Sequence, residues 1–290
     1  NATAMLTPFM PCGAKLPVIS LFAGVFFEDA PWVGTLMYFA GIGVILLGAL
    51  LVNRITGNRK KKSYFLIELP EYKRPSLKRA AAEMCARGWS YIVKAATIIL
   101  VCNTAVQIMQ SFTWQLTVAE SAADSILAFV AAPFARVLVP VVGVLSWQLA
   151  AAAVTGFIAK ENVVGTLAVC FVGLENLIDT EELAMLEGAG AEVAGIMAIT
   201  KAAALAYLMF NLFTPPCFAA LGAMNAEMGD RKWFWGGVGL QLATGYTIGF
   251  LVYQIGTLVT EGRLGAGFTG GVIAVVIMAG VLVYLCRRKK

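Results

Sequence analysis

The 290-residue chain contains no histidine. Imidazole moves protons near neutral pH and is the commonest metal ligand, so histidine metal sites, histidine proton relays and catalytic sets of the Ser-His-Asp or Cys-His type are excluded. Charge is also scarce, since 13% of residues are charged against about 25% in soluble domains. No G-x-x-x-x-G-K-[ST] phosphate loop occurs, and 57–60 does not complete one. The chain therefore has no nucleotide-hydrolysing motif, and we expect it not to be an enzyme.

Apolar sequence is abundant instead. Hydrophobic residues make up 59% of the chain, and its mean hydropathy is +0.79. Several runs approach the roughly 20 apolar residues that a helix needs to cross a bilayer. We therefore predict an all-α, polytopic transmembrane helical bundle of about seven or eight spans, with the lipid bilayer as its partner and no nucleic acid. The candidate spans are 5–27, 32–52, 88–110, 126–142, 146–172, 193–215, 234–259 and 268–286.

Charged loops predict an orientation, because Lys and Arg in short loops stay on the cytoplasmic side. Residues 53–87 hold ten basic residues against three acidic ones, whereas 173–192 hold six acidic residues and no basic one. Eight crossings with both termini in the cytoplasm satisfy this pattern. The weakest crossing is 126–142, which carries two prolines and an arginine, and the count fails if that segment is re-entrant or interfacial. Ser76 to Arg87 is typical of an amphipathic helix on the inner membrane surface.

Two short stretches look alike, Pro8 to Ala14 and Phe213 to Ala219, and each contains a Pro-Cys-X-Ala step. Proline lacks a backbone donor and clashes with the carbonyl one turn back, so it opens a helix. Freed carbonyls at membrane depth are tolerated only where they face protein or a wet cavity. Two such breaks in corresponding halves point to the binding site of a transporter with an inverted repeat.

A third weak point lies in Gly156 to Leu167, where Lys160, Glu161 and Asn162 interrupt an apolar run between glycines. An ionisable residue inside a span is a functional hypothesis by default. Glu161 could bind a cation while Lys160 neutralises the empty site; the alternative is a structural ion pair between helices. Lys94 and Lys201 are expected to snorkel or to form pairs. Arg136 is the remaining ionisable residue within a span.

Thiolate sulfur is a soft ligand that suits borderline and late divalent metals. Beside proline-freed carbonyls, a thiol, a carboxylate and a Met sulfur could together bind such an ion, although cysteine also packs as a small hydrophobe. The candidate metal ligands are Cys12, Cys217, Glu161, Met10 and Glu227. Lys160, Lys15 and Asn162 are candidates for gating or ion pairing.

In four stretches the chain resembles the membrane portion of the FeoB ferrous iron transporter family: 8–18, 68–72, 156–167 and 216–221. The resemblance implies Gate-type broken helices and Fe²⁺ import across the bacterial cytoplasmic membrane. The family's proposed path maps onto Cys12, Cys217 and Glu161, with Fe²⁺ as substrate and no permanently bound cofactor. Lys15 stands where the family motif usually has arginine. The resemblance further implies an N-terminal GTPase domain in a longer parent protein, small Feo accessory proteins and a homo-oligomer.

The expected organisation follows from this likeness. Residues 1–52 would belong to the first Gate repeat, 53–87 to a basic cytoplasmic loop, 88–142 to connecting segments and 146–259 to the second Gate repeat. A last span and basic tail would occupy 268–290.

Two other functions stay open. A nucleoside-type Gate carrier would need polar groups converging at mid-membrane, for which the candidates are Asn103, Thr104, Gln148, Asn162 and Asn211. A non-transporting membrane scaffold would leave the charged mid-span residues as dispensable pairs.

Overall fold

The computed structural model describes residues 2–27, 32–56, 76–115, 117–119, 121–172 and 197–287. Within these ranges the chain is helical, and an isolated bridge between Phe112 and Val118 is the one β contact. By length and composition four stretches can cross a membrane: Thr3–Phe26, Trp32–Asn53, Lys201–Met228 and Arg231–Glu261. The bent pair Ile126–Val142 and Trp147–Ile158 could supply a fifth. The all-α membrane fold is confirmed.

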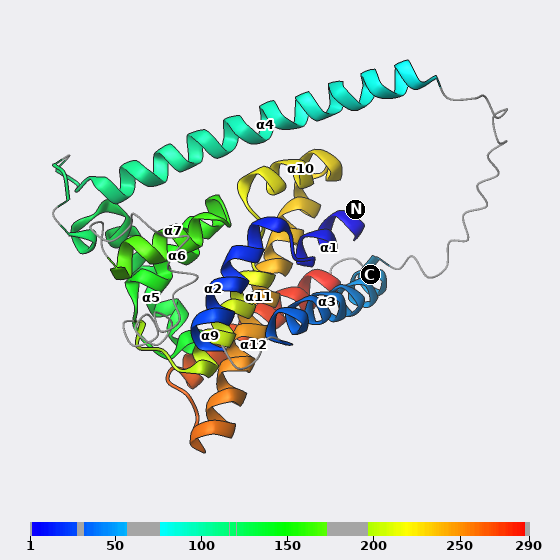
Figure 1. Ribbon diagram of the computed structural model, residues 1–290. Coiled ribbons are helices and arrows are strands. Elements are labelled where there is room, and N and C mark those ends of the chain that lie inside the picture. The colour runs from blue at the N-terminus through cyan, green and yellow to red at the C-terminus, as the bar shows by residue number, and fades with distance from the viewer. Residues whose placement is uncertain are drawn as a thin grey trace.

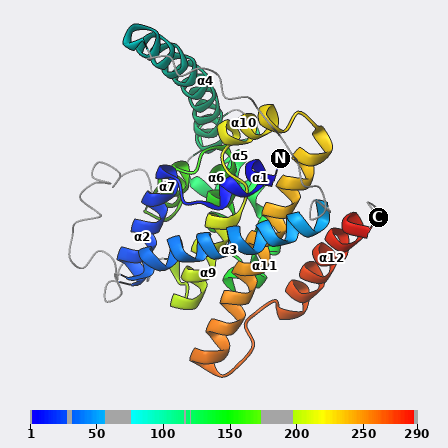
Figure 2. The same ribbon diagram turned by 90° about the vertical axis from the view of Figure 1, so that its right-hand side faces the viewer.

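Helix α9 (Lys201–Phe213) forms the centre of the bundle. It packs against α2 (Leu16–Phe26), α3 (Trp32–Thr56), α5 (Ile126–Val142) and α11 (Arg231–Glu261), which surround it in Figures 1 and 2. Every side chain from Ala206 to Phe213 is buried. A helix that is buried on all sides has no amphipathic stripe, and α9 is accordingly apolar almost all round.

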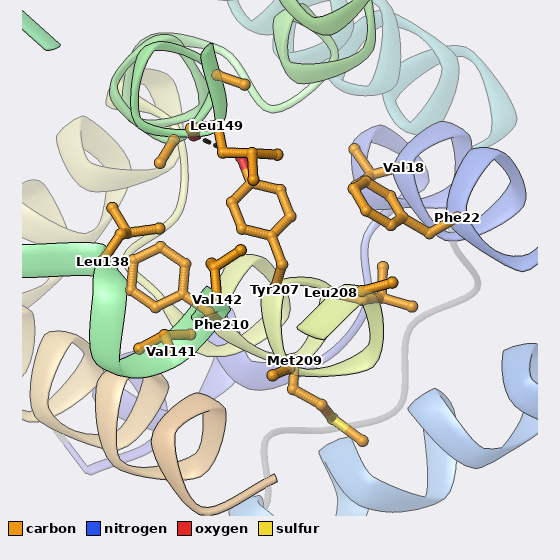
Figure 3. Close-up of a cluster of buried hydrophobic side chains, with 14 of the residues drawn as sticks. Val18, Phe22, Leu138, Val141, Val142, Leu149, Tyr207, Leu208, Met209 and Phe210 are labelled. Atoms are coloured by element: carbon orange, nitrogen blue, oxygen red, sulfur yellow. Dashed lines mark hydrogen bonds between the residues drawn. The ribbon is translucent and has the colours of Figure 1, made fainter. Parts of the chain in front are cut away.

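Tyr207 of α9 contacts both α2 and α6 (Trp147–Ile158), as Figure 3 shows. Its ring lies 5.5 Å, centroid to centroid, from that of Phe22 in α2. Its hydroxyl donates a 2.8 Å hydrogen bond to the carbonyl oxygen of Leu149 in α6. A buried tyrosine needs a partner for its hydroxyl, and here the partner is a main-chain carbonyl.

Both Pro-Cys stretches interrupt helices, as predicted. The first separates α1 (Ala2–Leu6) and η1 (Thr7–Phe9) from η2 (Gly13–Lys15) and α2. The second separates α9 from α10 (Phe218–Met228). The third predicted weak point is also a break, since α6 ends at Ile158 and α7 (Asn162–Val172) begins after an extended Ala159.

The orientation predicted for 126–142 is wrong. Helix α5 ends at Gly143, whose φ of 79° suits glycine, and then bends by 101° into α6. A side chain at Gly143 would collide with Tyr253, near the C-terminal end of α11. In the loop that follows α11, the Gly265 N–H donates to Gln254 Oε1 at 2.9 Å. The α5–α6 turn thus lies at the end of the bundle where α11 leads into α12. The charge pattern had placed these two turns on opposite sides, so the re-entrant alternative for 126–142 is favoured.

Helix α4 (Leu77–Ser111) joins the expected surface helix and the span 88–110 into one continuous rod. In both views it extends away from the bundle, and it contacts α5, α6 and α10 (Figures 1 and 2). The basic segment 57–75, the acidic segment 173–192 and residues 288–290 of the tail lie outside the described residues.

Helix α12 (Phe268–Arg287) offers a test of the packing at this end of the bundle. A Cβ on Gly271 would collide with the Phe250 ring and lie 2.9 Å from Pro140 Cβ, whereas one on Gly270 would meet open space. We expect Gly271→Ala to destabilise the protein by about 1–3 kcal/mol through overpacking. Gly270→Ala should be neutral or stabilise by up to about 1 kcal/mol through helix propensity. Thermal unfolding in detergent measures both, and equal effects would contradict this packing.

Candidate functional site

The end of α9 is set by two successive prolines. In an α-helix the N–H of residue i bonds to the carbonyl of residue i−4. The last such bond here runs from Thr214 N to Phe210 O, at 3.0 Å. Pro215 and Pro216 have no N–H, so the carbonyls of Asn211 and Leu212 are left without helical donors.

Two lysines from other breaks supply the missing donors. Lys160, between α6 and α7, donates to Asn211 O at 3.0 Å and contacts Thr214 Oγ1 at 3.1 Å. Lys15, at the end of the first break, donates to Leu212 O and to Pro8 O, both at 2.8 Å. Each proline therefore frees one carbonyl, and each of those carbonyls receives one ammonium group.

These ammonium groups are buried, each lysine being only 3% exposed. Neither pairs with a carboxylate among the described residues. The partial negative charge at the C-terminal end of α9 favours cations there. The Phe157 ring adds a favourable face, with its centroid 5.7 Å from Lys160 Nζ. Carbonyl dipoles thus take the place of counter-ions.

The two predicted thiols belong to the same neighbourhood. Cys12 precedes η2 and is exposed, and Cys217 precedes α10 and is half-buried. The Lys15 main-chain N–H donates to Cys12 O at 3.0 Å, and Cys217 directly follows Pro216, whose missing N–H frees Leu212 O. The structure therefore brings together the Pro-Cys breaks and the two lysines, from segments about 200 residues apart in sequence.

The other proposed ligands do not join this cluster. Glu161 points away from the interior and is exposed, and it forms no ion pair with its neighbour Lys160 within the described chain. Met10 is 46% exposed, and Glu227 is exposed on α10. No group of three or more Cys, Asp or Glu side chains in the described ranges is placed to hold a metal ion.

Asn162 has a role that its sequence position did not reveal. Its Nδ2 donates to Asn103 Oδ1 of α4 at 2.7 Å. Two turns after Asn103 on α4, Gln110 donates to Thr166 of α7 at 3.2 Å. Thr166 in turn bonds Thr155 of α6 at 3.0 Å. These polar side chains anchor α4 to the α6–α7 break. Polar residues spaced at helical intervals in apolar runs were the available signal.

The amides expected in a nucleoside site are already engaged. Asn103 and Asn162 bond each other, Asn211 Nδ2 donates to Tyr207 O at 3.2 Å, and Gln148 accepts from Ser146 at 2.9 Å. They do not converge on one cavity. Of the remaining ionisable residues in spans, Arg136 and Lys201 are exposed, and the side chain of Lys94 lies outside the described part.

Comparison with known families agrees with this architecture. Residues 92–231 match the Gate family, described as nucleoside recognition, and residues 35–87 match the family described as ferrous iron transport protein B C terminus. The Gate match begins within α4, in a segment that we had expected to be a connection. The broken, apolar helices define a polytopic α-helical membrane protein, and one part of it is similar to each of these two families.

Full-length relatives specify the family further. The Fe(2+) transporter FeoB of Staphylococcus aureus strain COL is 29% identical over 261 residues, which is 88% of this chain and 36% of the relative. The Fe(2+) transporter FeoB of Salmonella typhimurium is 28% identical over 298 residues, covering 87% of this chain and 38% of the relative. The chain is therefore similar to FeoB transporters over most of its own length, and the match is consistent with their C-terminal membrane portion. It thus spans little more than a third of the length of these relatives. No solved structure matches it.

The pairing of lysines with proline-freed carbonyls can be tested by a double-mutant cycle. Lys15→Met removes the donor to Leu212 O, and Pro216→Ala returns a main-chain N–H that can bond the same carbonyl. We expect the destabilisation caused by Lys15→Met to be smaller in the Pro216→Ala background. Thermal unfolding should give a coupling of about 0.5–3 kcal/mol, the range for groups that share a partner.

The second lysine supplies the matched control. Lys160→Met should couple in the same way with Pro215→Ala, because both act on Asn211 O. The crossed pairs, Lys15 with Pro215 and Lys160 with Pro216, should couple much less. Equal coupling in matched and crossed pairs would show that the lysines do not compensate individual prolines.

Proposed function

We propose that this chain is the membrane core of a ferrous iron importer in the bacterial cytoplasmic membrane. The observation that carries the proposal is the meeting of three helix breaks at the end of α9, with Cys12 and Cys217 beside the same two ammonium groups. Broken helices that meet in the interior supply unpaired main-chain groups where an ion can exchange its hydration shell. The named function of the FeoB relatives, Fe²⁺ transport, is the activity that fits these donors.

Cys12 and Cys217 act in this proposal as soft ligands along the path, and Fe²⁺ is the substrate. Thiolate suits a borderline divalent cation better than it suits Mg²⁺ or Ca²⁺, which prefer all-oxygen shells. Met10, Glu161 and Glu227 are accessible and lie outside the cluster of buried ammonium groups and proline-freed carbonyls. We assign them to approach and departure of the ion, where a cation retains part of its water.

Lys15 and Lys160 act as a gate. A cation at the thiols is repelled by both ammonium groups, and the carbonyls that could stabilise it are occupied by them. Passage therefore requires the ammonium groups to leave the end of α9. Asn162 follows Lys160 by two residues and is tied to α4 through Asn103, so movement of α4 would reach the gate.

The remaining parts of the transporter belong to the longer protein that the relatives represent. We assign regulation by GTP to an N-terminal domain, in the part of the relatives that this chain does not cover. We assign accessory Feo proteins to the cytoplasmic side. The protein is proposed to be a homo-oligomer. The eight crossings that would put both termini in the cytoplasm are not part of the proposal, because the α5–α6 turn lies at the same end of the bundle as the α11–α12 turn. No permanently bound cofactor is required.

A nucleoside carrier is the second candidate, because the Gate family is described as nucleoside recognition. A site for nucleosides needs free donors and acceptors lining one cavity. The amides available for that purpose bond each other or the main chain. The cation path is therefore favoured.

Anaerobic uptake of radioactive Fe²⁺ tests the proposed function. The protein as its gene encodes it would be expressed in a bacterial strain that lacks its own ferrous importer. We expect Cys12→Ser and Cys217→Ser each to lower uptake at least tenfold, because hard hydroxyl oxygen replaces soft sulfur. Glu161→Gln should lower it less, since this side chain lies outside the buried cluster. Uptake is normalised to the amount of protein in the membrane.

Cys85→Ser is the matched control. This thiol is exposed on α4, away from the breaks, so its replacement should leave uptake unchanged. Normal uptake by both Pro-Cys variants would overturn the proposed path. Uptake of labelled uridine in place of iron would support the nucleoside carrier, and neither activity would support the scaffold.

A further inference from the structure

A second buried cluster, separate from the main core, is rich in methionine. Its buried members are Met5, Val52, Met224, Met228 and Leu240. Met5 belongs to α1, while Met224 and Met228 lie one turn apart on α10. Each of the three methionines is 5% exposed. Methionine fills irregular cores, so burial alone says nothing about a ligand.

The three thioether side chains gather on one face of α11. Gly237 leaves room there: a Cβ on it would lie 3.3 Å from Met5 Cγ and 3.5 Å from Met228 Cε. One turn further along α11, Gln241 Nε2 lies 3.7 Å from Met224 Sδ. Three segments remote in sequence thus place their sulfur-bearing side chains around Gly237 and Gln241.

Gln241, whose Nε2 donates to Met224 Sδ at 3.7 Å, also carries a buried polar atom without a partner. The residue is fully buried, and its Nε2 donates to Met5 O at 3.1 Å. Its other polar atom, Oε1, has no hydrogen-bond partner, and it is the one buried side-chain polar atom in that state among the residues described. A buried acceptor without a partner costs free energy, and an electron-poor group placed against it would recover that cost.

We propose that Met5, Met224, Met228 and Gln241 form a binding site for a soft monovalent cation, Cu(I). Thioether sulfur is a soft donor that selects Cu(I) over harder first-row ions. All four donors are neutral, so the charge of the ion stays uncompensated. Because the cost of burying a charge rises steeply with its magnitude, a monovalent ion is favoured over Fe²⁺ or Zn²⁺.

An open groove between α10 and α11 is separated from this site by a single layer of side chains. It has a volume of about 710 Å³. Leu221, Phe234 and Val238 line the groove and also pack against the methionine cluster. These partly buried side chains form the wall that a cation would cross, and a rotamer change in them would open the way.

The site is distinct from the proposed iron path, since it uses no thiol and no carboxylate. It lies nevertheless on helices next to both Pro-Cys breaks, since α1 precedes the first break and α10 follows the second. A bound ion would link α1, α10 and α11 through one centre. Because the Cu(I) site shares no donor with the proposed iron path, it does not depend on Fe²⁺ being the transported ion.

Anaerobic Cu(I) titration against a chromogenic chelator tests the proposal. The purified protein carries serine at all six cysteines, so that thiols do not contribute. We expect one Cu(I) per chain, with sulfur ligation in the Cu K-edge absorption spectrum. Met→Leu replacement at residues 5, 224 and 228 conserves volume, and should weaken Cu(I) binding at least tenfold. Fe²⁺ and Zn²⁺ at the same concentration should not compete.

The matched control replaces three methionines elsewhere, Met37, Met109 and Met209, with leucine and should bind Cu(I) as tightly as the parent. If the serine variant does not fold, the same comparison is made on the cysteine-containing protein with its thiols alkylated. Absence of Cu(I) binding, equal weakening by the control set, or tighter Zn²⁺ binding would each overturn the site. Iron uptake plays no part in these outcomes, so they are independent of the proposed transport.

Discussion

The arrangement of the breaks depends on the C-terminal end of α9, where two carbonyls released by Pro215 and Pro216 are each met by a buried ammonium group. An unsatisfied carbonyl and a bare buried charge are both costly in a membrane, and each here offsets the other. Lys15 and Lys160 come from the two other helix breaks. Their hydrogen bonds to α9 therefore hold all three breaks together. Without the prolines, Lys15 would keep only Pro8 O and Lys160 only Thr214 Oγ1 as acceptors. Without the lysines, Leu212 O would lose its side-chain donor, and Asn211 O would keep only the Thr214 hydroxyl, at 3.2 Å.

In the proposed transport mechanism, the same contacts connect two requirements of cation passage. While Lys15 and Lys160 hold the end of α9, they repel a second cation and occupy the oxygens that could bind it. Displacing them removes the repulsion and frees those oxygens in a single step. Cys12 and Cys217 stand beside this point, so an ion that reaches the thiols meets both effects together. In the closed state the carbonyls would bind the ammonium groups, and in the open state they would bind the transported cation.

Local chemistry could be predicted from the sequence, but partners distant in the chain could not. Proline acts on the residue four positions back, so the breaks at 10–12 and 214–217 were evident, as was the weak point at Lys160. The partner of Lys160 lies 51 residues away on α9, and its sequence neighbour Glu161, which suggested an ion pair, is exposed. The orientation of 126–142 failed for the same reason. Loop charges do not reveal that Gly143 packs against Tyr253.

Helix α4 has the proportions of a lever. Its 35 residues extend over about 52 Å, and the bonds from Asn103 and Gln110 fasten it near one end. The arm from Leu77 to Asn103 is about 39 Å long, so a rotation of about 5° around the fastening moves its far end by roughly 3 Å. Conversely, a movement of a few ångströms at Leu77 would reach Asn162, beside Lys160, through Asn103 as a much smaller displacement with a larger force. In the proposed gate, a helix of this length would convert movement of its Leu77 end into torque at the α6–α7 break.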